Sequence, residues 1–130
     1  MKVMALDYGS ARTGVAVSDP TGTLARPLGV VEGAATDNGL AELKRLAREE
    51  EVERVVVGLP LTLRGTRGEQ AAETERFVVT LRGAVEVPVE LFDERFTTDL
   101  AQQTAGTAPE DALAAAHLLS SYLEWCAARS

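Results

Sequence analysis

The sequence has a single cysteine, Cys126, and a single histidine, His117. One cysteine excludes an intramolecular disulfide and a zinc site built from several cysteines, and one histidine excludes a histidine-rich metal site. Aromatic residues make up only 5% of the chain, which argues against a sheet surface built for stacking bases. No apolar run approaches the ~20 residues of a transmembrane helix, and the N-terminus turns acidic too early for a signal peptide. We therefore expect a cytoplasmic protein without a membrane span.

Basic residues are also scarce, since 13 lysines and arginines face 20 acidic residues and give a net charge of −7. Such a chain does not attract nucleic acid through its overall field, which excludes a globally basic nucleic-acid binder. The length of 130 residues, with 45% hydrophobic and 25% charged residues, is typical of one compact domain. We expect that domain to span residues 1–130.

The hydrophobic pattern changes along the chain from strands to alternating helices and strands. Strands are expected at residues 3–6, 14–18, 24–31, 55–57 and 89–92, and Pro27 indicates that the third strand either lies at a sheet edge or is broken there. Helices are expected around 40–47, at 69–82 with a stop at Gly83, at 97–104, and from 108–110 to about 128. This order predicts an α/β fold with a mixed sheet and helices on both faces. Ligands of such sheets bind beyond the carboxyl ends of the strands.

Acidic residues stand at three element ends of this pattern. Asp7 ends the first strand, Asp93 and Glu94 end the last strand, and Glu110 and Asp111 open the last helix. Oxygen ligands of this kind suit Mg²⁺ or Mn²⁺, and two such ions about 4 Å apart can promote phosphodiester cleavage. Small residues at 112–116 allow the last helix to approach the sheet closely. Taken singly, each acid can instead stabilise a turn or a helix N-terminus.

Two loops have the composition of phosphate contacts. The turn at residues 7–14 contains Ser10 and Arg12, and the loop at 61–68 contains Arg64 and Arg67. The turn is neither a Walker A loop nor a dinucleotide fingerprint, because a strand rather than a helix follows it. An ordinary hairpin turn and a solvated surface loop are the alternative interpretations.

Four ordered blocks, at residues 5–19, 57–61, 93–98 and 111–123, resemble the YqgF family, also called the RuvX family. The resemblance implies an RNase H-like fold and a bacterial cytoplasmic nuclease that trims the 5′ end of precursor small-subunit ribosomal RNA. An older assignment for the family is cleavage of four-way DNA junctions. The acidic triad of the family corresponds to Asp7, Glu94 and Asp111, which would hold Mg²⁺ or Mn²⁺. We favour Glu94 over Asp93 because neighbouring strand residues face opposite ways.

The resulting hypothesis is a divalent-metal-dependent nuclease that hydrolyses phosphodiester bonds in structured RNA. In this hypothesis Ser10, Arg12 and Thr97 orient the site or the phosphate, and Arg64 and Arg67 hold the nucleic-acid backbone. The chain departs from the family in the charges of the 64–67 loop and in lacking basic residues at 100–110. With the net charge of −7, these departures predict weak, salt-sensitive binding that depends on a metal or a partner.

Three other functions remain open at this stage. Resolution of four-way DNA junctions requires a homodimer, because symmetric cuts in two strands need two active sites. A non-catalytic RNA-binding or ribosome-assembly factor would bind RNA without cutting it. A nucleotide-binding kinase or ATPase of similar topology needs two such halves, whereas this chain offers one. Other acids, such as Glu73 and Glu75, are expected on helices or loops away from the strand ends.

Overall fold

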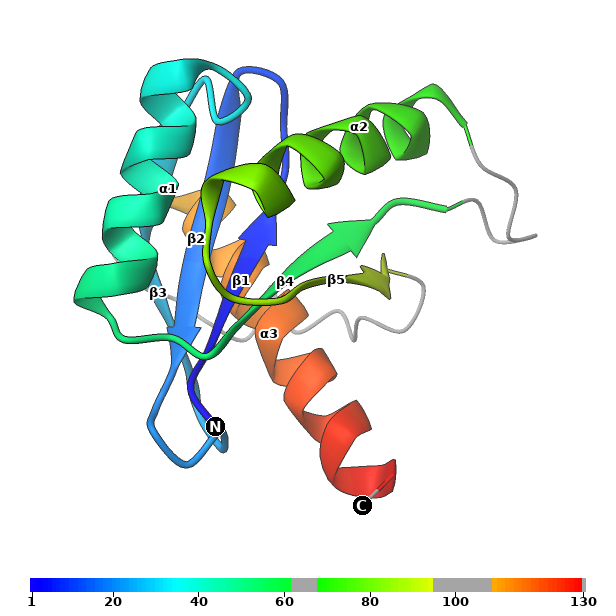
Figure 1. Cartoon of the computed structure of the whole chain (residues 1–130). Coiled ribbons are helices and arrows are strands. Elements are labelled where there is room, and N and C mark those ends of the chain that lie inside the picture. Colours follow the sequence, from blue (N-terminus) through cyan, green and yellow to red (C-terminus); the bar gives the residue numbers. More distant parts are fainter. Residues whose placement is uncertain (62–67, 95–108, 130) are drawn as a thin grey trace.

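Five strands form one mixed sheet in the part of the chain that the computed structural model describes, which is residues 1–61, 68–94 and 109–129 (Figure 1). The strands are β1 (Val3–Asp7), β2 (Arg12–Ser18), β3 (Ala25–Glu32), β4 (Arg54–Leu59) and β5 (Val89–Asp93). Their order in the sheet is β3-β2-β1-β4-β5. The three N-terminal strands pair antiparallel, whereas β4 pairs parallel with both β1 and β5. The carboxyl ends of β1, β4 and β5 therefore meet at one edge of the sheet.

Three helices cover the two faces of this sheet in the described residues: α1 (Asp37–Glu49), α2 (Glu69–Ala84) and α3 (Glu110–Arg129). The side chains of β1 point alternately into two core layers, one on each face of the sheet. Met4 and Leu6 pack in the layer that holds α1 and α2. Val3 and Ala5 pack in the second layer, against α3. Figure 1 shows α1 and α2 on one side of the strands and α3 on the other. The predicted α/β class, with helices on both faces, is confirmed.

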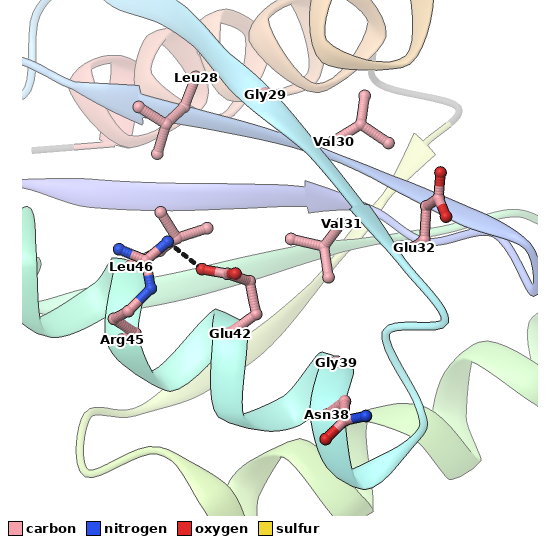
Figure 2. Close-up of a pocket in the computed structure, with 10 residues that line it drawn as sticks. All are labelled: Leu28, Gly29, Val30, Val31, Glu32, Asn38, Gly39, Glu42, Arg45 and Leu46. Atoms are coloured by element: carbon pink, nitrogen blue, oxygen red, sulfur yellow. Dashed lines mark hydrogen bonds and ion pairs between the residues drawn. The ribbon is translucent and has the colours of Figure 1, made fainter.

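Strand β3 is continuous and lies at the edge of the sheet, which is the first of the two possibilities that Pro27 indicated. Proline has no amide hydrogen and cannot complete a ladder on both sides, so an edge position tolerates it. The pairing of β2 with β3 shifts between Val15 and Ala16, next to Pro27. A pocket of about 440 Å³ lies between β3 and α1, and the Glu42–Arg45 ion pair lines it (Figure 2). None of the proposed site residues that the structure describes lines this pocket.

The helix boundaries agree with the sequence pattern except at the end of α2. The Thr36 side chain caps α1 by accepting a hydrogen bond of 3.1 Å from the amide of Gly39. Gly83 was expected to stop α2, but it does not adopt the positive φ of a glycine stop, and the helix continues to Ala84. The helix ends where Val85 becomes extended and buried. The helix expected at 97–104 lies outside the described residues.

Helix α3 is the longest helix that the structure describes, with 20 residues. Its sheet-facing side includes the buried residues Ala112, Ala115 and Ala116, so the backbone of the helix comes close to the sheet, as the small residues predicted. Neither α3 nor any other helix in the described ranges has the length and apolar character needed to span a bilayer.

Candidate active site at the carboxyl ends of the strands

Asp7 is the last residue of β1, and the residue next to it on each of the two neighbouring strands is a glycine. Gly14 of β2 is its partner in the antiparallel register. On β4, Val57 is the partner of Leu6, so Gly58 follows at the level of Asp7. Continued alternation from Val3 and Ala5 directs the Asp7 side chain to the face that α3 covers. The missing side chains at the two glycines leave space around this carboxyl group for other chain segments.

Gly14 allows the start of α3 to touch the sheet directly. A Cβ atom on Gly14 would lie 1.8 Å from the carbonyl oxygen of Asp111, so no other residue fits there without moving the helix. This contact between the first turn of α3 and the strand beside β1 fixes the backbone position of Asp111. The negative charge of Asp111 is close enough to raise the pKa of Asp7. The structure therefore brings these two predicted site residues together.

Gly58 of β4 likewise leaves space on the sheet for Glu94, the residue that follows β5. A Cβ atom on Gly58 would lie 2.5 Å from Oε1 of Glu94, so this side chain lies directly over the glycine. Phe92, the partner of Gly58, packs in the layer of α3, whereas alternation turns Asp93 to the opposite face. Glu94 thus lies on the face of Asp7 and Asp93 does not, in agreement with the preference for Glu94.

The carboxyl groups of Asp7 and Glu94 are half-buried and joined by a hydrogen bond. Burial, the negative charge of Asp7 and this hydrogen bond raise the pKa of Glu94 to about 7. Burial is also the main cause that raises the pKa of Asp7, although the bond from Glu94 opposes it. Two carboxyl groups in contact retain a proton between them, and here Glu94 donates to the carboxylate of Asp7. A bound cation would remove the need for that proton.

The Asp111 carboxylate forms an ion pair with Arg12, the first residue of β2. Arg12 Nε lies 3.2 Å from Asp111 Oδ2, and the two side chains are 66% and 34% exposed. This ion pair gives the third carboxylate a partner other than Asp7 and Glu94. Among the side chains that the structure describes, no three acidic, histidine or cysteine groups are gathered tightly enough to hold a metal ion. Two carboxyl groups are thus in position, and the third is adjacent and engaged elsewhere.

A pocket of about 140 Å³ opens beside Asp7 and Glu94 and adds residues that the sequence did not predict. Its lining consists of the turn after β1, the end of β4 and the start of α2: Asp7, Tyr8, Gly9, Ser10, Pro60, Gln70, Glu73, Thr74 and Glu94. Ser10, a predicted phosphate contact, is therefore at the site. Glu73 was expected away from the strand ends, and that expectation is wrong.

The position of Glu73 follows from an aromatic contact between the turn and α2. The rings of Tyr8 and Phe77 stack with centroids 4.3 Å apart, which holds the turn against the helix. Glu73 precedes Phe77 by one helical turn and so shares its face of α2. Burial, followed by the charge of Glu73, raises the pKa of Tyr8. The four-residue spacing of Glu73 and Phe77 indicates that both lie on one face of α2. It places Glu73 at the site only once the contact between Phe77 and Tyr8 is known.

Three of the proposed substrate contacts are not located by the structure. Arg64, Arg67 and Thr97 lie outside the described residues. The candidate site therefore consists of Asp7, Glu94 and the adjacent Asp111, with Ser10 and Arg12 at its margin.

Comparison with known proteins identifies the family of this chain. Residues 1–125 match the model of the RuvX family, which is described as "Holliday junction resolvase". Two relatives named "Putative pre-16S rRNA nuclease" come from Chloroflexus aurantiacus and Rubrobacter xylanophilus. The first is 43% identical, over 94% of this chain and 86% of the relative. The second is 47% identical, over 95% of this chain and 92% of the relative.

Solved structures support the fold independently of these names. RuvC of T. thermophilus in complex with a Holliday junction substrate has a TM-score of 0.62 and 16% identity, and the match covers 98% of this chain and 96% of RuvC. The Holliday junction resolvase of fowlpox virus has a TM-score of 0.56 and 14% identity, with 96% and 99% of the two chains covered. The likeness to RuvC confirms the RNase H-like fold, and the family match confirms the resemblance found in the four sequence blocks. The chain therefore belongs to the RuvX family, whose relatives are named as nucleases.

Proposed function

We propose that this chain is a divalent-metal-dependent nuclease that hydrolyses phosphodiester bonds in precursor 16S ribosomal RNA. The observation that carries the proposal is the hydrogen-bonded pair of Asp7 and Glu94 at the strand ends, with Asp111 fixed beside it. Family membership supports nuclease activity, and the names of the relatives favour the RNA substrate. The carboxylates and their pocket supply the chemistry that such an activity needs.

Asp7 and Glu94 fit a divalent cation as oxygen ligands, because burying two carboxyl groups in contact is costly without a proton or a cation between them. Asp111 would become the third ligand by rotation of its side chain, since its backbone is already fixed beside β2. Mg²⁺ and Mn²⁺ both accept carboxylate oxygens. When bound, the ion supplies activation of water and stabilisation of the leaving oxygen. With such an ion bound, Glu94 would be ionised and would no longer donate a hydrogen bond to Asp7.

Polar side chains close to the three carboxyl groups can hold the substrate phosphate. Arg12 is largely exposed, and a guanidinium group forms strong paired hydrogen bonds with phosphate oxygens. Ser10 lines the pocket and can donate its hydroxyl hydrogen. We assign the same kind of contact to Arg64, Arg67 and Thr97 on the basis of the sequence. The acidic charge of the rest of the chain makes these few contacts important for binding.

The raised pKa of Glu94 gives a prediction for pH dependence. The folded, metal-free protein keeps a proton on Glu94 up to about pH 7, whereas the unfolded chain loses it near 4.5. Since the folded state binds more protons in this window, the stabilising contribution of Glu94 is present at low pH and lost as the pH rises through 7. Glu94→Gln should remove this contribution and flatten the fall in melting temperature between pH 5 and pH 8 in EDTA. Glu110→Gln, on an exposed residue, is the control, and equal slopes for both variants would contradict the prediction.

Glu73 gives a prediction for substrate binding. Its charge lines the pocket that the phosphate must enter, so Glu73→Gln should tighten RNA binding by about two- to five-fold at low salt. Glu75→Gln removes the same charge from another face of α2 and should have a smaller effect. The measurement is the KM for RNA cleavage of the two variants and the unaltered protein at two salt concentrations. A KM that rises in Glu73→Gln would instead show that Glu73 assists binding.

The family description favours a second candidate, cleavage of four-way DNA junctions. The deciding experiment compares a precursor 16S RNA fragment with a four-way DNA junction, each with Mg²⁺, Mn²⁺ or EDTA. The proposal predicts metal-dependent cleavage of the RNA. Symmetric cleavage of the DNA junction alone, by a homodimer, would replace it with the second candidate. RNA binding without cleavage in any metal would favour a non-catalytic ribosome-assembly role.

A further inference from the structure

The Arg12–Asp111 ion pair links the proposed metal site with the proposed phosphate contact. Its two side chains come from the start of β2 and the first turn of α3, and they meet at 3.2 Å. Asp111 is the proposed third ligand, while Arg12 is an exposed cation in contact with Asp111. Asp111 can therefore bind either Arg12 or the metal, and Arg12 can bind either Asp111 or a phosphate.

Rotation of one side chain is enough to change the partner of Asp111. The backbone of α3 cannot shift readily at this point, because the carbonyl of Asp111 already lies against Gly14. The side chain is only half-buried, so it has room to turn. In the present rotamer the described residues include no three-ligand cluster, although the charge of Asp111 still reaches Asp7. A turn of the Asp111 carboxylate toward Asp7 would complete the triad.

Arg12 can exchange Asp111 for another anionic partner. Its side chain is 66% exposed and is bound to Asp111 through Nε, so the ion pair is of the weak, solvent-screened kind. A phosphodiester offers a guanidinium two oxygens in the paired geometry that it prefers. The phosphate of an incoming strand should therefore compete well with Asp111 for Arg12.

We propose that Arg12 is a positioning residue that holds Asp111 away from the metal until a substrate phosphate draws the guanidinium off. The inference rests on the proposed function, since it needs a metal at Asp7 and Glu94 and a phosphodiester at Arg12. Its consequence is that metal binding and substrate binding strengthen each other, by equal factors in the two directions. Residual metal affinity without substrate comes from Asp7 and Glu94, and full affinity requires Asp111 as well.

Mn²⁺ binding in solution tests this coupling without measuring cleavage. Mn²⁺ affinity is determined by electron paramagnetic resonance for the unaltered protein, Arg12→Gln and Arg76→Gln. Arg76 is an exposed cation of α2 whose charge acts on Tyr8 in the pocket and which has no ion pair with Asp111 among the described contacts, so it controls for the loss of one charge. Arg12→Gln should bind Mn²⁺ about two- to five-fold more tightly than Arg76→Gln does, which is the range of an exposed ion pair.

A second series adds dimethyl phosphate, a slowly hydrolysed phosphodiester, against sodium chloride at equal ionic strength. It should raise the Mn²⁺ affinity of the unaltered protein and of Arg76→Gln, and leave that of Arg12→Gln unchanged. Equal Mn²⁺ affinities in the two variants, weaker binding in Arg12→Gln, or an equal response to dimethyl phosphate would overturn the inference. Asp7→Asn tests the metal site separately from the role of Arg12. If this variant leaves the Mn²⁺ affinity unchanged, the proposed function is refuted, whatever the result for Arg12→Gln.

Discussion

Asp7→Asn is expected to reduce metal-dependent RNA cleavage by at least about a hundred-fold, since the metal contributes several kcal/mol to the transition state. Asp7 ends the central strand β1 and interacts with both Glu94 and Asp111, so the substitution removes the carboxylate that these two acids share as a neighbour. The fold should survive, because an asparagine oxygen can still accept the hydrogen bond from protonated Glu94. The measurement is the single-turnover cleavage rate with saturating Mn²⁺.

Asp93→Asn is the matched control for this experiment. It makes the same chemical change one residue before Glu94, on a side chain that the strand directs to the opposite face. Its cleavage rate should stay within a few-fold of that of the unaltered protein. Cleavage retained by Asp7→Asn, or lost equally in both variants, would refute the assignment of Asp7 and the distinction between the two sheet faces.

Gly14→Ala is expected to lower the free energy of unfolding by about 3 kcal/mol, the upper end of typical overpacking costs. The added methyl group would overlap the carbonyl oxygen of Asp111 at 1.8 Å, and backbone on both sides leaves no flexible tip to move. Helix α3 must shift outward, which opens the core between it and the sheet and moves Asp111 from Asp7. Urea unfolding measures the loss of stability. The displacement of Asp111 from Asp7 should also lower the Mn²⁺ affinity.

Gly29→Ala provides the comparison on the same sheet. Gly29 lies on the edge strand β3, its φ is not positive, and a Cβ atom added there would have no atom of the described residues within 4 Å. The substitution should therefore be neutral or slightly stabilising, because alanine loses less backbone entropy on folding. Equal urea midpoints for the Gly14 and Gly29 variants would mean that α3 does not rest on Gly14.

The candidate acidic positions could be proposed from the sequence because each lies at an element boundary. Apolar runs end at Asp7 and before Asp93, and the last amphipathic segment begins at Glu110, so local patterns marked these acids as candidates, and the family resemblance singled out Asp7, Glu94 and Asp111. The choice of Glu94 over Asp93 required only the alternation of strand residues. The parallel pairing of β1 with β4 and of β4 with β5 then brings these ends together.

Features that depend on contacts between distant segments could not be predicted in this way. The close approach of α3 to Gly14, the stacking of Tyr8 on Phe77 and the placement of Glu73 in the pocket all require the packed structure. The Arg12–Asp111 ion pair is of the same kind, because both residues had plausible separate roles. Local preference also failed at Gly83, where the helix continues for one more residue before Val85 enters the core.

The negative net charge, which excludes a globally basic nucleic-acid binder, is partly explained by the site itself. Asp7, Asp111 and Glu73 place negative charge at the strand ends, and Glu94 adds to it on losing its proton; a divalent cation would offset this charge. Binding of RNA should therefore require the metal as well as the arginines.

We propose that the strand ends bind a divalent metal through Asp7 and Glu94, joined by Asp111. An anomalous difference map from crystals of the protein grown with Mn²⁺ and a short RNA would locate the metal. We expect a peak between the carboxyl groups of Asp7 and Glu94, with an oxygen of Asp111 also within coordination distance. A fully ordered site without such a peak, or Mn²⁺ bound only elsewhere on the chain, would contradict it.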